Sequence, residues 1–352
     1  NDIFQWGEGF YRIFGNKKNK NLFRLIDWAR LTHPVDREKH QQSWDEFLKD
    51  SKRHKWLNVF RFKKQNGQYT YVQEIGYLIR DDRGKPLRMI GVLRDISDQR
   101  KSETVKQLQF QISQIFKLEK NLKSILSEVL EFLVNYSGFK TAEIWLVSSS
   151  NTHLNLLSYH TVDVTGMQYF ELSKDIIKMF KGKGIPGIVW EKQKIEVWNE
   201  LYDNKMFLRR DAAKQAGLKT GIGLPLYHNQ TFVGVLMFCH DDVIDDDGID
   251  IEPFYFLGEY LGSEIMRKKQ EEEMYLLFQS APEIVAIASP DGKFTKVNQT
   301  FCNLLGYTED ELRSKPFQYF LHPDDVINTN KEYDETITGE RKAANFINRY
   351  RT

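Results

Sequence analysis

The sequence predicts an α+β protein in which three domains with antiparallel sheets are joined by long helices. Apolar and polar residues alternate with a period of two at 68–79 and 86–93, and turn residues separate these stretches, as in neighbouring strands with one buried face. Two polar stretches without Gly or Pro, at 99–136 and 268–279, are typical of helices that bridge folded blocks. A length of 352 residues is enough for two or three hydrophobic cores.

The two ends of the chain read as copies of one module. Three anchors recur at nearly the same offset: Phe14-Gly15 and Leu305-Gly306, His33-Pro34 and His322-Pro323, and Arg61-Phe62 and Arg349-Tyr350. A constant offset favours an ancestral duplication. The first copy starts close to its helix and the second stops inside the strand that follows. We therefore expect the chain to be a stretch of a longer modular protein.

The charges are balanced, with 50 Lys and Arg against 49 Asp and Glu, so no global field favours nucleic acid or a membrane surface. Two cysteines cannot form a disulfide framework, which suits a reducing compartment. The apolar stretches, such as 232–239, are too short to span a bilayer, and the N-terminus lacks the pattern of a signal peptide. We expect a cytoplasmic protein, and a membrane segment elsewhere in the parent protein stays open.

The helix expected at 99–136 carries one apolar stripe. Its apolar residues follow a seven-residue repeat with one break, at positions 105, 108, 112, 115, 122, 126, 129 and 133. The half after Asn121 has a sheet of its own to pack on, with a second chain as an equal alternative. Val105, Leu108, Ile112 and Ile115 have no neighbouring domain sequence to cover them. We therefore expect a parallel homodimer held by this part of the helix.

The middle block is expected to hold strands at 141–147 and 154–159, then an irregular region rich in Gly, Trp and Lys, then a closing hairpin. The hairpin strands are 221–226 and 232–238. A helix from Pro253 follows and carries Phe254, Leu257, Leu261 and Ile265 on one face. The expected organisation is a first domain at 1–100, a helical linker at 101–120, a middle domain at 121–267, a second linker at 268–279 and a last domain at 280–352.

Both ends resemble PAS domains. The last block resembles the front half of one, through Asp291-Gly292-Lys293-Phe294, Val297-Asn298, Leu305-Gly306-Tyr307, Glu311-Leu312 and His322-Pro323-Asp324-Asp325. The first block resembles the rest, through Asn66-Gly67, Gly91 and Asp95-Ile96-Ser97. In PAS domains that last junction leads into a signalling helix.

The middle block resembles a GAF domain through residues 182–190, 216–226 and 233–238. The resemblance implies a pocket that is roofed by the irregular region. Trp190, Trp198, Tyr202, Met206 and Phe207 fall in that region, so we expect them to line a largely apolar pocket for a small molecule. Core packing is the alternative for the same residues.

Gly182, Gly184 and Gly187 have the spacing of a dinucleotide-binding loop. Such a loop follows a strand and opens a helix. Here 174–180 reads as a helix and the β-branched stretch 188–190 reads as a strand. We therefore interpret the glycines as a structural turn.

Two further motifs depart from the patterns they resemble. The acidic run 241–248 would need ligands at Val243 and Phe254 to be a calcium loop, so we interpret it as a solvated loop. Asn204-Lys205-Met206-Phe207 faintly resembles a motif of cyclic-nucleotide GAF domains, but Arg209-Arg210-Asp211 stands where the Asp-Glu pair is expected. That departure puts cyclic-nucleotide binding in doubt.

No metal or covalent cofactor is expected. Cys239-His240 cannot close a zinc site without distant partners, and it lies outside the segment by which GAF relatives attach a bilin, so Cys239 reads as a buried free cysteine. Cys302 is not in the Asn-Cys-Arg motif of flavin-binding PAS photoreceptors, so a flavin adduct is not expected. We interpret His33 and His322 as structural loop residues that precede a helix, and not as haem ligands.

No catalytic constellation is visible in the sequence. The resemblance implies a sensory array of the kind found in sensor histidine kinases, which senses a small ligand or relays a conformational change through its helical linkers. The output domain would lie in the same parent protein, outside this chain. Two alternatives stay open: a dimerisation scaffold without a ligand, and a regulatory fragment of a cyclic-dinucleotide enzyme.

Overall fold

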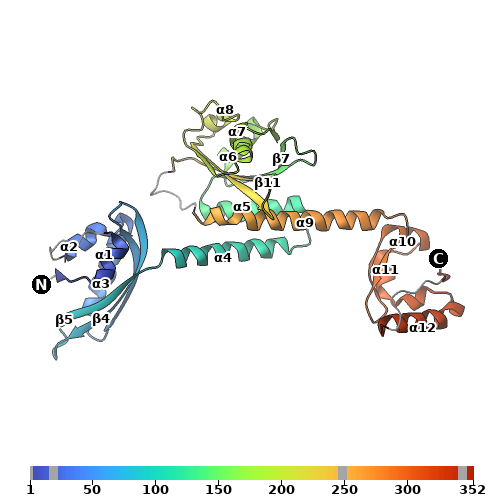
Figure 1. Ribbon diagram of the computed structural model, residues 1–352, viewed down its shortest axis with the longest axis horizontal. Coiled ribbons are helices and arrows are strands. Elements are labelled where there is room, and N and C mark those ends of the chain that lie inside the picture. Colours follow the sequence, from blue (N-terminus) through green and yellow to red (C-terminus); the bar gives the residue numbers. More distant parts are fainter. Residues whose placement is uncertain (1–2, 16–22, 245–251, 340–346) are drawn as a thin grey trace. The chain divides into compact units, whose positions relative to one another are not determined.

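The computed structural model describes residues 3–15, 23–244, 252–339 and 347–352 (Figure 1). The chain forms two compact units, Asn1–Glu119 with Lys123–Gly262, and Lys120–Leu122 with Ser263–Thr352. The expected α+β class is confirmed, because every strand pair among the described residues is antiparallel. In the part of the chain that the structure describes, no helix is long and apolar enough to cross a membrane.

The first block builds its core on one face of a three-stranded meander, β3-β4-β5. Its elements are β1 (Ile3–Phe4), α1 (Glu8–Phe14), β2 (Phe23–Arg24), α2 (Leu25–Leu31), α3 (Pro34–Lys49), β3 (Lys55–Lys63), β4 (Tyr69–Arg80) and β5 (Pro86–Asp95). The strands expected at 68–79 and 86–93 are confirmed as β4 and β5. Burial largely alternates along β4, whereas β5 is mostly exposed and its expected alternation is not seen. Phe60 and Phe62 of β3 are buried in one cluster with Phe14 and Trp28.

The last block begins with a two-stranded sheet. Its elements are β12 (Ala286–Ala288), β13 (Phe294–Val297), α10 (Gln299–Leu305), α11 (Glu309–Ser314), the 3₁₀ helices Phe317–Phe320 and Pro323–Asp325, and α12 (Val326–Ile337). Asn298 caps α10 by accepting a hydrogen bond from the Phe301 amide at 3.2 Å. The block therefore runs from strand to turn to strand to helix.

The two end blocks repeat one set of hydrogen bonds. Asp36 accepts from the amide, Nε and Nη2 of Arg61 at 2.9, 2.9 and 2.8 Å. Asp325 accepts from the same three groups of Arg349 at 2.8, 3.0 and 2.8 Å. We call each set an Asp–Arg clasp. It joins the start of a helical segment to a residue further along the chain, which lies in β3 in the first block, and it explains why the sequence repeats these residues.

His33 and His322 have a structural role at the start of helical segments, as expected. Nδ1 of His33 accepts from the Val35 amide and Nδ1 of His322 accepts from the Asp324 amide, each at 3.3 Å. Both imidazoles therefore cap a helical turn that begins with proline.

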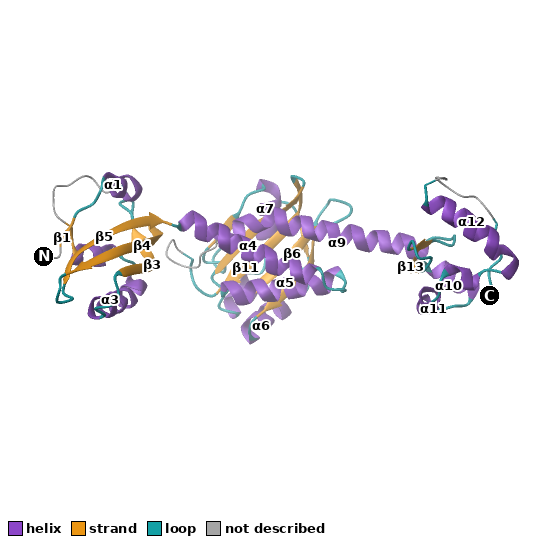
Figure 2. Ribbon diagram, turned by 90° about the horizontal axis from the view of Figure 1, so that it is seen from below, coloured by secondary structure: helices purple, strands orange, loops and turns teal. Residues whose placement is uncertain are grey.

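The middle domain is a six-stranded sheet in the order β8-β7-β6-β11-β10-β9. Its elements are α5 (Leu122–Ser137), β6 (Thr141–Val147), β7 (Leu154–Thr161), α6 (Val164–Leu172), β8 (Lys178–Met179), α7 (Gly184–Lys192), β9 (Glu196–Trp198), α8 (Arg210–Gln215), β10 (Thr220–His228), β11 (Thr231–His240), the 3₁₀ helix Glu252–Phe256 and α9 (Leu257–Ser280). Helices α6, α7 and α8 lie on one side of the sheet, and α5 and the start of α9 lie on the other (Figures 1 and 2).

The start of α9 lies very close to β10 because two glycines face that strand. A Cβ on Gly258 would lie 2.4 Å from the Pro225 carbonyl oxygen, and one on Gly262 would lie 2.2 Å from that of Tyr227. Phe254, Leu257, Leu261 and Ile265 are buried, as the sequence predicts for this helix.

The long helix expected at 99–136 is in fact two helices. The chain leaves the helical conformation after Phe116, so α4 (Ser97–Phe116) and α5 are separate. Leu108 and Ile112 are buried within the chain itself, Val105 and Ile115 are half-buried, and the Tyr260 hydroxyl donates to the Gln109 carbonyl at 3.0 Å. The expectation that this stripe lacks a covering domain is therefore wrong. The homodimer itself stays a prediction.

The prediction of a helix before Gly182, Gly184 and Gly187 and of a strand after them is also wrong. A strand, β8, precedes it and a helix, α7, follows it. Tertiary packing overrides local propensity here, since residues 184–190 are all buried. The glycines still have structural reasons: Gly182 and Gly184 have φ of 75° and 58°, and a Cβ on Gly187 would lie 2.0 Å from the Phe180 carbonyl oxygen.

Candidate functional site

Helix α4 is attached to the first sheet by a polar cluster at its N-terminus, which we call the α4 joint. The Ser97 amide and the Thr70 hydroxyl donate to Asp95 at 3.0 and 2.9 Å, and the Ser97 hydroxyl accepts from the Tyr71 amide at 2.9 Å. Lys64 lies 3.1 Å from the same carboxylate. Burial acts to raise the pKa of Asp95, but the hydrogen bonds from Ser97 and Thr70 outweigh it and lower that pKa. Asp95 is therefore an ionised anchor at neutral pH.

The rest of α4 contacts the middle domain. The Lys101 ammonium lies 4.7 Å from the centre of the Phe256 ring, and the Tyr260 hydroxyl donates to the Gln109 carbonyl. Further along the helix, Leu108, Ile112 and Phe116 are buried. One helix is thus fixed by hydrogen bonds in the first domain and by packing against the middle domain. A shift of the α4 joint would therefore change the structure of both the first domain and the middle domain.

The structure brings together three of the five residues expected to line a pocket. Trp190 and Phe207 belong to one buried cluster of the middle domain, and Trp198 packs against it. Tyr202 is half-buried, whereas Met206 is 51% exposed. Trp190 stacks on Phe232 with ring centres 6.1 Å apart, and the cavity beside Phe207 measures only about 10 Å³. The role of these residues in ligand binding stays a prediction.

A buried ion pair lies in the same layer, between the sheet and helices α6 to α8. Nη1 of Arg209 donates to Oε1 of Glu143 at 2.8 Å, and the Trp145 indole donates to the other oxygen at 2.7 Å. Nη2 of Arg209 donates to the Ile176 carbonyl at 2.7 Å. The exposed fractions of the two charged side chains are 3% and 0%.

Aromatic rings fix the Arg209 guanidinium. Its carbon lies 5.0 Å from the centre of the Trp145 ring and 5.5 Å from that of Tyr169. Burial acts to lower the pKa of Arg209, but the charge of Glu143 outweighs it and raises that pKa. Burial raises the pKa of Glu143, against the Arg209 charge. Because both Glu143 oxygens accept hydrogen bonds, we assign the ionised carboxylate at neutral pH.

One donor of this arginine has no partner. Nε of Arg209 is buried, and among the described residues nothing accepts its proton. Arg209 also lines a pocket of about 470 Å³, which we call the Arg209 pocket. Its other lining residues come from β7, from α6 and from the segment after α6: Leu156, Tyr159, Met167, Phe170, Glu171, Ser173, Lys174 and Ile177. The site therefore combines apolar walls with one buried, unsatisfied cationic donor.

Neither Glu143 nor Arg209 was among the residues expected from the sequence. A signal for Glu143 is present, since it is the single charge in the apolar strand Thr141–Val147. A charge at a fully buried strand position requires a partner. The sequence offers no means of choosing Arg209 over its neighbour Arg210, because that choice depends on how α8 begins.

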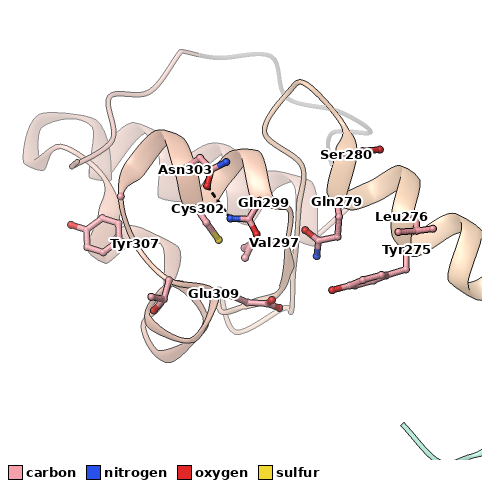
Figure 3. A pocket seen from close by; sticks show the side chains of 12 residues that line it. Tyr275, Leu276, Gln279, Ser280, Val297, Gln299, Cys302, Asn303, Tyr307 and Glu309 are labelled. Atoms are coloured by element: carbon pink, nitrogen blue, oxygen red, sulfur yellow. Dashed lines mark hydrogen bonds between the residues drawn. The ribbon is translucent and has the colours of Figure 1, made fainter. Parts of the chain in front are cut away.

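The last block carries an open groove of about 830 Å³ (Figure 3). Tyr275, Leu276 and Gln279 at the end of α9 form one side, and Gln299, Cys302 and Asn303 of α10 lie opposite. The Gln299 amide donates to the Asn303 side chain at 2.9 Å. Burial raises the pKa of the Cys302 thiol, so this half-buried sulfur is held in its unreactive form.

The end of β11 brings three possible metal ligands together. Ligand atoms of His240, Asp241 and Asp242 lie within 4.8 Å of one another. Lys140 and Lys219 already pair with the two carboxylates, at 3.3 and 3.5 Å. Residues 245–248 of the acidic run lie outside the described residues. Cys239 is buried, as expected, and burial raises the pKa of its thiol to about 12.

Comparison with known proteins bears first on the two end blocks. Residues 3–93 and 294–352 match the model of one family, described as the PAS fold. Two segments of the chain are thus similar to the PAS fold. These segments contain the two Asp–Arg clasps, so one fold accounts for the repeated residues and for their repeated hydrogen bonds.

Two curated relatives match parts of the chain. A probable diguanylate cyclase, DgcE of Escherichia coli (strain K12), is 28% identical over 87 residues, or 24% of this chain and 8% of that protein. The aryl hydrocarbon receptor nuclear translocator homolog of Drosophila melanogaster is 38% identical over 55 residues, or 16% of this chain and 9% of that protein. The matches span less than a tenth of either relative.

Solved structures similar to the chain include two GAF domains. One is the nlh2 GAF domain of A. aeolicus in an inactive state, at 21% identity and a TM-score of 0.39, covering 48% of this chain and 99% of that one. Another is the GAF domain of a phosphoenolpyruvate-protein phosphotransferase from Coxiella burnetii. Its sequence identity is 14% and its TM-score 0.39, and the match covers 49% of this chain and 98% of that one. A free methionine-R-sulfoxide reductase from Neisseria meningitidis is also similar. Its sequence identity is 16% and its TM-score 0.37, and the match covers 49% of this chain and 91% of that one.

Proposed function

We propose that the chain is the sensory input region of a cytoplasmic signal-transduction protein. In this proposal the two PAS-fold segments and the middle domain sense a small ligand or relay a conformational change, and an output domain outside the chain responds. The observation that carries the proposal is α4, which is fixed to the first sheet through Asp95 and Ser97 and contacts the middle domain through Lys101 and Gln109. A helix held in this way is a mechanical link between two domains.

The α4 joint is suited to a two-state change. Asp95 is only partly buried, and it is held by three short polar contacts rather than by a packed core. Such contacts can be exchanged for water at modest cost, whereas packed side chains have few alternative arrangements. A ligand that binds the two arrangements with different affinity would shift their populations and move α4.

The class of output domain is a second part of the proposal. The leading candidate is a histidine kinase, in keeping with the PAS and GAF resemblances of the sequence. The match to a probable diguanylate cyclase favours a cyclic-dinucleotide enzyme as the alternative, although it covers only 8% of that protein. Homodimerisation through the helical linkers belongs to the same proposal, since paired output domains need paired inputs.

A helix-phase experiment tests the proposed relay. Residues 1–280 are joined to the catalytic domain of a histidine kinase, and one to four alanines are inserted after the exposed Glu103 of α4. Each inserted residue rotates the first domain by about 100° about the helix axis. Kinase activity should change with one or two residues and return toward the starting value with four, which restore the phase to within about 40°. The relay would be contradicted if kinase activity did not depend on the number of inserted alanines, or if a Gly-Gly insertion left it unchanged.

A further inference from the structure

We propose that the middle domain binds a small amphiphilic carboxylate in the Arg209 pocket, with the carboxylate at Arg209 and the apolar body between β7 and α6. The inference deepens the proposed sensory function, because it names the class of ligand. It does not depend on the relay through α4.

The first support is the unpartnered donor. Nη1 of Arg209 is occupied by Glu143 and Nη2 by the Ile176 carbonyl, which leaves the buried Nε–H without an acceptor. Buried polar groups nearly always have a partner, so Arg209, which lines the pocket, keeps one donor unused. A carboxylate is the acceptor that best matches the planar edge of a guanidinium.

The second support is the composition of the pocket walls. Leu156, Phe170 and Ile177 supply apolar surface, and Tyr159 stacks on Phe170 with ring centres 4.0 Å apart. Met167 lies 60% exposed on the same lining. Pockets of this kind favour a ligand with an apolar body and one polar group that fixes its orientation.

The third support is the arrangement of charge. Lys174 also lines the pocket, where its ammonium pairs with Glu171 at 2.6 Å on the exposed side. Glu143 already balances the charge of Arg209, so the feature that favours an anionic head group is the unused donor of a cation and not an excess of positive charge. The Trp145 and Tyr169 rings already hold the guanidinium in place, so little side-chain ordering is needed when a ligand binds.

Calorimetric titration of the whole purified chain with three ligands of equal length tests the proposal. The probes are octanoate, octanamide and octylamine, which share one apolar body and differ in the head group. Octanoate should bind with a stoichiometry of one per chain and at least about tenfold more tightly than either of the others, since a hydrogen bond to a charged group exceeds one to a neutral group. No heat from octanoate at millimolar concentration, or equal binding of octanamide, overturns the assignment.

Variants locate the binding. Arg209→Lys keeps a cation opposite Glu143 but cannot also serve the ligand, so octanoate affinity should fall about tenfold or more. Lys174→Glu should weaken octanoate several-fold by repulsion and leave the fold intact, because the side chain is largely exposed. Lys194→Glu makes the same charge change at an exposed turn outside the pocket and should leave the affinity unchanged.

The two lysine variants keep the test decisive if Arg209→Lys does not fold. Equal affinity in Lys174→Glu and Lys194→Glu would overturn the location. A negative binding result would leave the helix-phase experiment untouched, and a loss of phase dependence in that experiment would leave octanoate binding untouched. Failure of the ligand assignment and failure of the proposed relay are thus distinguishable.

Discussion

Asp36 and Asp325 each hold an arginine through three hydrogen bonds, and this arrangement lowers the pKa of both carboxyls. Hydrogen bonds from Arg61 are the main cause for Asp36, and those from Arg349 hold the pKa of Asp325 at about 2. A carboxyl with a lowered pKa in the folded state stabilises the fold above its ordinary value of 3.8, and this stabilisation is lost as pH falls below that value. Both end blocks should therefore lose stability in acid for the same reason.

Asp36→Asn should destabilise the first domain by about 2 kcal/mol at neutral pH, because it removes the ionised acceptor of a partly buried clasp. Below the ordinary pKa of 3.8 the difference from wild type should shrink, since the wild-type carboxyl is then being protonated. Chemical denaturation followed by tryptophan fluorescence at several pH values measures this. Asp82→Asn, in an exposed turn of the same domain, is the control and should change stability at neutral pH by less than about 0.5 kcal/mol.

Trp190 decides between a pocket wall and a solid core in the middle domain. It is buried in the main cluster and stacked on Phe232, so Trp190→Ala should cost about 3 to 5 kcal/mol, as a core truncation does. Met206→Ala is the matched control from the same predicted set; it is 51% exposed and should cost less than about 0.5 kcal/mol. Denaturation of both variants beside wild type gives the answer. A loss below about 1 kcal/mol for Trp190→Ala would favour the pocket wall.

Residue-level prediction from the sequence succeeded where local pattern determines the role. His33 and His322 cap helical turns because the proline that follows each of them fixes that role, and Cys239 is buried because it ends a core strand. Arg209 could not be found, because its function depends on Glu143, which lies 66 residues away in the chain. Pairing across that distance is decided by the packing of α6 and α8 on the sheet, and no local spacing encodes it.

At the scale of elements, α4 shows how a heptad pattern can describe packing within one chain. Leu108 lies 1% exposed and Ile112 is fully buried, whereas Phe110 on another side of the helix is 59% exposed. The stripe predicted from the sequence is therefore real, but Leu108 and Ile112 are covered within the chain itself. An α-helical stripe carries no information about whether the covering surface belongs to the same chain or to a second one.

Leu108→Lys should therefore destabilise the protein by about 3 kcal/mol or more in any oligomeric state, because it places a charge in a buried contact of the chain itself. Phe110→Lys, two residues along the same helix, should change stability by less than about 0.5 kcal/mol. Thermal unfolding combined with light scattering separates the effects. If Leu108→Lys melted like wild type while a dimer dissociated, the stripe would be an interface between chains after all.

Elements with a strong local signal were predicted correctly. The meander β3-β4-β5 follows from alternation and from its two Gly-containing turns, and the hairpin β10-β11 turns at Asn229-Gln230, where φ is 48° and 63°. Helix α7 was missed because Ile185, Ile188 and Val189 favour a strand locally, while burial on every side makes the helix stable there. The break between α4 and α5 was missed because neither Gly nor Pro marks it.

At the scale of the whole molecule, the account depends on whether α4 couples the domains it connects. The α4 joint and the Tyr260–Gln109 hydrogen bond lie on the same helix, twelve residues apart, which is about 18 Å along its axis. Energetic coupling over that distance requires the helix to move as one body. A joint that merely tethers the first domain would leave the distal half of α4 undisturbed.

Hydrogen exchange of the full chain, compared between Asp95→Asn and Asp36→Asn, measures that coupling most directly. Both variants remove one partly buried carboxylate from the first domain, but only Asp95 contacts the start of α4. The account predicts that Asp95→Asn alters amide exchange at 108–116 of α4 and at 257–262 of α9, while Asp36→Asn alters exchange in the first domain alone. Unchanged exchange at 108–116 in Asp95→Asn, or equal changes there in both variants, would contradict the relay.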